Sequence, residues 1–168
     1  MNPKEIGQKA LEYDKFSGCS QSVLLALQEA FNIGDAMSFK AATTLSGGVA
    51  RRGETCGALL GALMALGLVK GREDIRDTQT YRDAMAPANE VIDKFKARLQ
   101  REFGFKKPLE STICRDIQRS IYGRGYDLNK PGDYKAFLDA GGHGDTGCPK
   151  VCAVAATVTA EKIQVLLR

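Results

Sequence analysis

Residues 53–69 read GETCGALLGALMALGLV and include the longest apolar run of the chain. The run from Cys56 to Val69 carries no charge and is dominated by alanine and leucine, two strong helix formers, so it predicts an apolar helix over Cys56–Leu68. The run has 14 residues and is interrupted by glycines, whereas a helix needs about 20 apolar residues to cross a bilayer. It therefore predicts a buried helix and no membrane span.

On both sides of this stretch, helical periodicity and capping residues predict further helices. Asn2 precedes Pro3 as an N-cap, Asp35 and Ser111 are further caps, and Pro87 is expected to kink or split the longest helix. The other expected helices are 3–13, 19–31, 36–45, 73–103, 112–122, 134–138 and 149–167. No strand alternation and no repeat is evident. The fold prediction is an all-α, single-domain helical bundle (residues 1–168) of about six to eight helices, with a glycine-rich loop before the last helix.

Composition is that of an ordinary globular protein. The 168 residues are 43% hydrophobic and 26% charged, and a chain of this length can bury a core without covalent staples. The first residues, Met1–Glu5, do not resemble a secretory leader, so we expect a cytoplasmic protein whose thiols stay reduced. Five cysteines against one histidine then indicate metal binding or reactivity rather than a disulfide framework, which an odd count also disfavours.

The net charge of +4 is small and unevenly spread. Residues 94–130 hold ten Lys/Arg against four Asp/Glu, a balance of +6 that leaves −2 for the rest. A solvated helix face is the favoured interpretation, with docking of an acidic partner or an anion as the alternative. The charge gives no reason to expect nucleic acid as a partner.

Four cysteines fall at the predicted starts of different helices: Cys19, Cys56, Cys114 and Cys148. Backbone N–H groups without helical partners point outward there, and the helix dipole favours a thiolate over a thiol. Cysteines in such positions are those whose pKa falls and that become nucleophiles or metal ligands.

Each of the four cysteines also heads an apolar stripe, so the sulfurs are expected to converge at one end of the bundle. The alternative is that they are core residues, because free cysteine is commonly buried as a small hydrophobe. No pair has the Cys-x-x-Cys spacing of zinc fingers or thioredoxins.

Glycines and arginines surround the second cysteine. Gly57 and Gly61 lie four residues apart on one helix face, which indicates close approach of another backbone or a cofactor at Gly57 and tight helix packing at Gly61. Arg51 and Arg52 are candidates to offset negative charge on a cofactor, although exposed arginines on a turn are common.

With these residues in view, the chain resembles the C_GCAxxG_C_C family of redox-active proteins. The matching pieces are Gly18–Val23, Gly53–Ala62, Cys114–Ile117 and Cys148–Val151, which span nearly the whole chain. The resemblance implies four recurring cysteines (Cys19, Cys56, Cys114 and Cys148) that act in redox chemistry and hold an iron–sulfur cluster or another metal.

Two further residues are candidate extra ligands. Cys152 departs from the family pattern, which usually has an aliphatic residue there, and it is interpreted as a core substitution, a spare ligand or a resolving thiol. His143 lies in a glycine loop five residues before Cys148. A surface position is favoured for it, with metal ligation as the alternative.

Four functions remain open from the sequence. Iron–sulfur electron transfer with an unidentified redox partner protein leads, followed by dithiol–disulfide exchange without a metal. Structural zinc in a helical interaction module and an interaction protein with cysteines as core filler are the others. The sequence contains no hydrolase motif and no phosphate-binding motif. It does not indicate whether the protein is an enzyme, and it leaves the oligomeric state open.

Overall fold

The computed structural model describes the chain from Met1 to Arg168 as eight α-helices and one 3₁₀ turn. The helices are α1 (Pro3–Asp14), α2 (Cys19–Phe31), α3 (Ala36–Ala41), α4 (Gly57–Lys70), α5 (Thr78–Phe103), α6 (Cys114–Tyr122), α7 (Pro131–Asp139) and α8 (Cys148–Leu166), with the 3₁₀ turn η1 (Ala42–Leu45) after α3. No strand forms, and one isolated bridge joins Thr55 to Ile113. The all-α prediction is confirmed.

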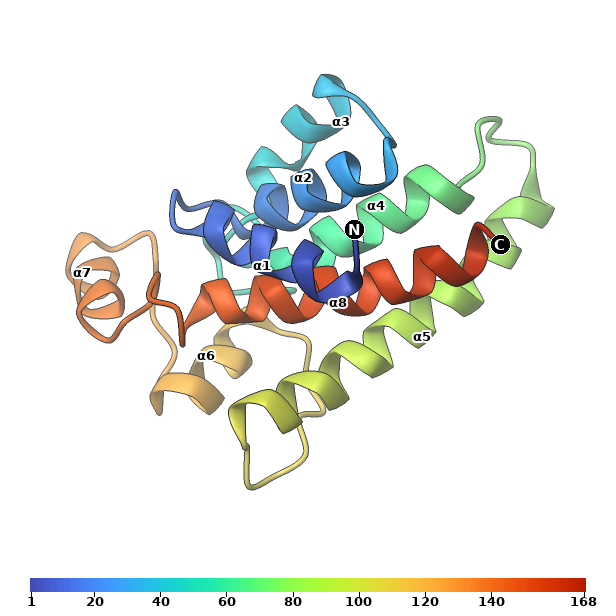
Figure 1. The fold of residues 1–168 in the computed structure, drawn as a ribbon. Helices are drawn as coiled ribbons and strands as arrows, with labels where there is room; N and C mark the ends of the chain where they lie inside the picture. Colours follow the sequence, from blue (N-terminus) through green and yellow to red (C-terminus); the bar gives the residue numbers. More distant parts are fainter.

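Helix α8 runs through the middle of the bundle (Figure 1). It packs against α1, α2, α4 and α5, and most of its length is buried because alanine, valine and threonine let neighbouring helices approach closely. Large side chains of α5, such as Phe95 and Leu99, fill the space beneath it. Helices α6 and α7 lie beside the first turns of α8, at the end opposite the C-terminus (Figure 1).

The predicted caps explain the starts of two helices, α1 and α3. Asn2 accepts a hydrogen bond from the N–H of Glu5, and the Glu5 carboxylate accepts one from the N–H of Asn2, a complete capping box. Asp35 caps α3 through Ser38 in the same reciprocal way. These interactions are local in the chain, which is why the sequence predicts them.

Several details of the helices differ from the prediction; α7, for example, spans Pro131–Asp139 rather than 134–138. Helix α5 begins at Thr78 rather than at residue 73, because Asp77 caps it. It continues past Pro87 as one helix, so the alternative of a split is wrong. Ser111 does not cap a helix starting at 112; its hydroxyl accepts from the N–H of Ile113 and donates to Asp116, and α6 begins at Cys114.

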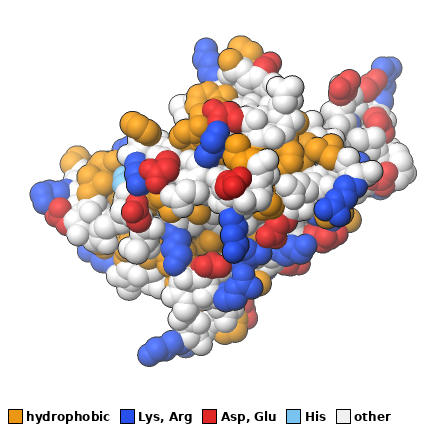
Figure 2. Space-filling view, in the orientation of Figure 1, with side chains coloured by type: hydrophobic (Ala, Val, Ile, Leu, Met, Phe, Trp, Pro, Cys, Tyr) orange, Lys and Arg blue, Asp and Glu red, His pale blue; other side chains and the backbone are white.

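No helix combines the length and apolar character that a membrane span requires. On the face drawn in Figure 2, basic and acidic side chains are interspersed with apolar patches. Six of the ten basic residues in 94–130 form ion pairs: Lys96, Arg98, Arg101, Arg119, Arg124 and Lys130. The stretch is therefore mostly a solvated, locally paired surface, as favoured from the sequence.

Candidate functional site

The four cysteines from separate helices line one cavity. Cys19, Cys114 and Cys148 are the first residues of α2, α6 and α8, and Cys56 is the N-cap of α4. All four border a cavity of ≈ 60 Å³. One water molecule needs roughly 10–15 Å³, so the cavity has room for a few water molecules. The sulfurs are all free thiols.

Backbone pairing brings the second and third cysteines together. The N–H of Cys56 donates to the carbonyl of Thr112 (2.9 Å), and the N–H of Cys114 donates to the carbonyl of Glu54 (2.6 Å). These two bonds flank the isolated bridge between Thr55 and Ile113. The starts of α4 and α6 are thus held side by side, although their cysteines are 58 positions apart in the sequence.

Glycines leave room for the sulfurs. A Cβ atom at Gly57 would lie 2.6 Å from Sγ of Cys19 and 2.8 Å from the carbonyl oxygen of Leu45, so only glycine fits. A Cβ at Gly48 would lie 2.6 Å from Cβ of Cys114. At Gly61 a Cβ would meet the backbone of Ser20, which is the tight helix packing expected there. Gly57 therefore serves the cysteine site, and Gly61 serves the α2–α4 contact.

Burial, rather than the helix dipole, dominates the acidity of the thiols. Burial together with the charges of Asp14 and Cys56 raises the pKa of Cys19 to about 12, although the N–H of Gly47 acts in the opposite direction. Burial also raises the pKa of Cys56, Cys114 and Cys148. The expectation of easily formed thiolates is wrong for the protein without a bound cation, because removing a charge from water costs more than helix N–H groups return.

No three Cys, His, Asp or Glu side chains lie close enough together to hold one metal ion. The four sulfurs share a cavity, yet they are not gathered around a single point. A tetrahedral zinc site requires four ligands at about 2.3 Å from one ion. The present arrangement is wider than that.

The two arginines of the preceding turn differ in position. Arg51 lines the cavity, and its guanidinium lies over the ring of Tyr134 at 4.8 Å. Arg52 is exposed and does not border the cavity. Only Arg51 is placed to act on charge inside it.

Cys152 lies in the apolar core and does not border the cavity. It is fully buried, and its S–H faces the carbonyl oxygen of Cys19 at 3.9 Å. The interpretation as a core substitution agrees with this position.

His143 is not the surface residue favoured from the sequence. Its side chain is 22% exposed, borders the cavity and packs edge-on against Phe137. Its Nδ1 lies 3.6 Å from Oδ2 of Asp14, beyond hydrogen-bond distance. The glycines around it let the loop fold back over the cavity instead of extending into solvent.

Asp14 is a site residue that was not predicted from the sequence. Its carboxylate is fully buried and borders the cavity. Its two oxygens and Nδ1 of His143 are the three buried side-chain polar atoms without a hydrogen-bond partner in the molecule. Burial raises the pKa of Asp14, and the neighbouring His143 opposes that shift. The available signal was its spacing: Ile6, Ala10 and Asp14 follow one another at four-residue intervals on the buried face of α1.

Tyr122 was also missed. Its hydroxyl accepts a hydrogen bond from the N–H of Cys148 (3.1 Å), and two acceptors lie within reach of its proton: Sγ of Cys148 (3.6 Å) and the carbonyl oxygen of Gly142 (3.4 Å). Burial, followed by the charge of Cys148, raises the pKa of Tyr122, so the phenol keeps its proton. Cys114, Gln118 and Tyr122 share one face of α6 at helical spacing, which was the signal in the sequence.

Comparison with known proteins agrees with the cysteine pattern. A family model described as "Putative redox-active protein (C_GCAxxG_C_C)" matches residues 17–162. No curated protein and no solved structure matches the chain. The match includes all four cavity cysteines and covers most of the sequence, so the chain belongs to the C_GCAxxG_C_C family.

Proposed function

We propose that Cys19, Cys56, Cys114 and Cys148 hold an iron–sulfur cluster that the protein uses for electron transfer. The observation that carries the proposal is that four thiols from four helices border one small cavity. Four cysteine thiolates satisfy the ligation of both [2Fe–2S] and [4Fe–4S] clusters. Such a cluster, when bound, supplies a one-electron carrier.

The raised thiol pKa values support a metal–thiolate site over free thiol chemistry. Dithiol–disulfide exchange needs an attacking thiol of low pKa, and burial raises the pKa of every cavity cysteine. A bound metal centre removes this obstacle, because its positive charge deprotonates a coordinating thiol. Buried thiols that disfavour the free thiolate are therefore suited to ligation.

The spacing of the donors supports a cluster over a single zinc ion. A zinc site brings its ligands around one point, whereas a cluster distributes them over several iron atoms. No three donors surround one point in this protein, although the four sulfurs share a cavity. Tyr122 and Arg51 are placed to stabilise negative charge on the sulfurs, by hydrogen bonding to Cys148 and by charge at the cavity wall.

The test is iron and acid-labile sulfide in protein produced under cluster-assembling conditions and kept from air. We expect brown wild-type protein with stoichiometric iron and sulfide. Replacing any one of Cys19, Cys56, Cys114 and Cys148 by serine is expected to remove most of the bound iron.

Cys152→Ser is the control, since Cys152 is a buried cysteine of α8 that does not border the cavity. This variant is expected to keep its iron, and circular dichroism reports whether each variant still folds. Colourless, iron-free wild-type protein overturns the proposal. So does loss of iron in Cys152→Ser alone among the five folded variants.

A further inference from the structure

The turn before α4 has an unusual backbone. Five consecutive residues, Gly47 to Arg51, have positive φ angles between 51° and 70°. Three of them (Val49, Ala50 and Arg51) are not glycine, and each such residue costs roughly 1–2 kcal/mol in a left-handed conformation. Surrounding contacts must hold this turn in place.

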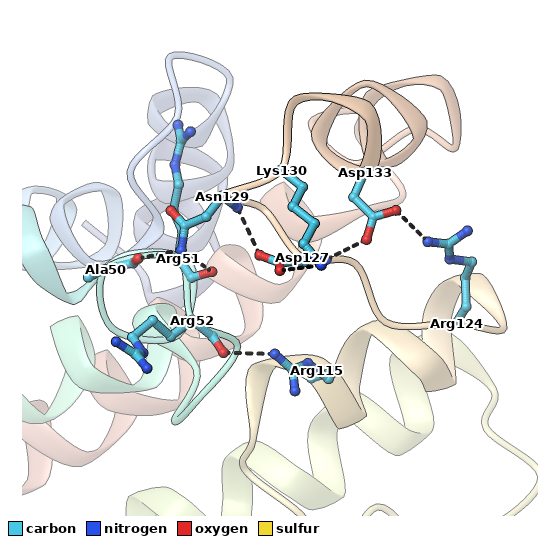
Figure 3. Close-up of polar contacts among 9 residues, drawn as sticks. All are labelled: Ala50, Arg51, Arg52, Arg115, Arg124, Asp127, Asn129, Lys130 and Asp133. Atoms are coloured by element: carbon cyan, nitrogen blue, oxygen red, sulfur yellow. Dashed lines mark hydrogen bonds and ion pairs between the residues drawn. The ribbon is translucent and has the colours of Figure 1, made fainter.

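Two side chains from other elements hold the turn through its carbonyl groups (Figure 3). Nδ2 of Asn129 donates to the carbonyl oxygens of Ala50 (3.2 Å) and Arg51 (3.3 Å). The guanidinium of Arg115, one residue after Cys114, donates to the carbonyl of Arg52 (3.0 Å). The turn is thus attached to α6 and to the loop before α7, at the edge of the cysteine cavity.

This arrangement gathers basic side chains beside the cavity. Arg51 borders both the cavity and a neighbouring hollow on the surface. Ser17, Gly18 and Ser46 also border both. Figure 3 shows Arg51 and Arg52 leaving the turn in different directions, with Arg115 next to Arg52. We call Arg51, Arg52 and Arg115 the arginine rim.

The arginine rim differs from the other basic residues nearby. None of its three guanidinium groups forms an ion pair, whereas Arg124 and Lys130 pair with Asp133 and Asp127. Glu54 is the one unpaired acid in the same turn, so the rim together with Glu54 has a balance of +2. Exposed cations without ion pairs next to a cavity attract a negatively charged partner to that surface.

We propose that the arginine rim docks an acidic partner protein at the cysteine cavity. Since this rests on the proposed function, the partner is a one-electron carrier whose own cofactor is surrounded by Asp and Glu. An electron passes between the cluster and the partner's cofactor, one oxidised and the other reduced, with no bond made or broken. A partner at this face lies beside Arg51, the charged residue that touches both the cavity and the surface.

The test uses charged redox probes with the cluster-loaded protein. Hexacyanoferrate(III), an anion, accepts one electron from the reduced protein and becomes hexacyanoferrate(II); hexaammineruthenium(III) is the cationic counterpart. At about 10 mM ionic strength, Arg52→Glu is expected to slow oxidation by the anion about fivefold and to accelerate oxidation by the cation. The Arg52 guanidinium has no hydrogen bond or ion pair to lose, so the fold should tolerate this change.

Arg82→Glu is the control, because Arg82 is an exposed arginine of α5 without an ion pair. It should leave both rates nearly unchanged, and salt should abolish the effect of Arg52→Glu. Equal rates for wild type and Arg52→Glu at low salt, with the cluster intact, overturn the docking proposal and leave the proposed function standing.

If the protein binds no cluster, the proposed function fails and the rim is tested separately. A fluorescent oligoglutamate peptide should then bind wild type and Arg82→Glu at low salt and lose affinity for Arg52→Glu. Absence of binding, or binding that ignores residue 52, overturns the docking proposal as well.

Discussion

The two ends of α8 lie in opposite environments. Its C-terminal half buries Val158 and Ile163 in the same hydrophobic cluster as Val91, Phe95 and Leu99. Its first residue, Cys148, instead borders a cavity that contains the buried carboxylate of Asp14. The C-terminal end of α8 is stabilised by apolar burial. The cysteine end keeps a buried polar group, the Asp14 carboxylate, whose burial costs free energy when nothing is bound in the cavity.

This difference shows how one helical scaffold carries both stability and a site. Apolar burial stabilises by about 25 cal/mol per Å², and α8 shares that burial with four neighbouring helices. The cysteine end holds a buried carboxyl group without a hydrogen-bond partner and a left-handed turn, each of which costs free energy. Unfavourable local features of this kind gather where function requires them.

The largest difference is expected between the same substitution made at the two ends of α4. Gly57→Ala places a Cβ against Sγ of Cys19 and the backbone of Leu45, so we expect destabilisation of about 3 kcal/mol and loss of the bound iron. Gly67→Ala meets no atom within 4 Å and should stabilise the helix by up to about 1 kcal/mol. Denaturant unfolding and iron content measure both.

The Gly67 variant is the matched control, since it makes the same substitution in the same helix. If Gly57→Ala unfolds like Gly67→Ala and keeps its iron, the close approach at Gly57 has no bearing on the site.

The second prediction concerns the buried, ionisable carboxyl group of Asp14. Asp14→Asn keeps the shape of the side chain without its ionisation, so we expect the metal-free protein to gain about 2 kcal/mol in free energy of unfolding at about pH 8. Thermal unfolding measured across pH provides the test.

The pH dependence follows from the direction of the pKa shift. Burial raises the pKa of Asp14 in the folded state, so below the ordinary carboxyl value of 3.8 the group is protonated in both states and costs no charge burial. As pH rises from that value through the raised pKa, the unfolded state releases the proton first and wild type loses stability. The advantage of Asp14→Asn should therefore vanish in acid; an equal advantage at all pH values contradicts the charge as its cause.

The smallest effect concerns a single hydrogen bond to sulfur. Tyr122→Phe removes the hydroxyl that faces Sγ of Cys148 and accepts from its N–H. A hydrogen bond of about 1 kcal/mol corresponds to about 40 mV for a one-electron couple, so the reduction potential should fall by about that amount, because the more negative reduced state loses a donor. Redox titration of the loaded protein measures it.

Tyr126→Phe is the control for this change, because Tyr126 packs in the same aromatic group and its hydroxyl makes no hydrogen bond to a cysteine. An equal shift in both variants would mean that aromatic packing, rather than the bond to Cys148, sets the potential.

Local features of the fold were predictable from the sequence. The caps at Asn2 and Asp35, the glycine breaks and the apolar run after Cys56 act over a few residues, and so they identify the helices directly. The errors also came from local competition: Ser111 bonds to Asp116 and the N–H of Ile113 instead of starting a helix, and Asp77 caps α5 later than expected.

Helix periodicity and capping act within one or two turns of the chain, so the all-α fold and the four cysteines at helix starts could be predicted from the residues. The cavity that these cysteines share with Asp14 could not, nor could the rise that burial causes in their pKa values. The physical reason is that burial depends on which helices cover a side chain, and residues far apart in the sequence provide that cover.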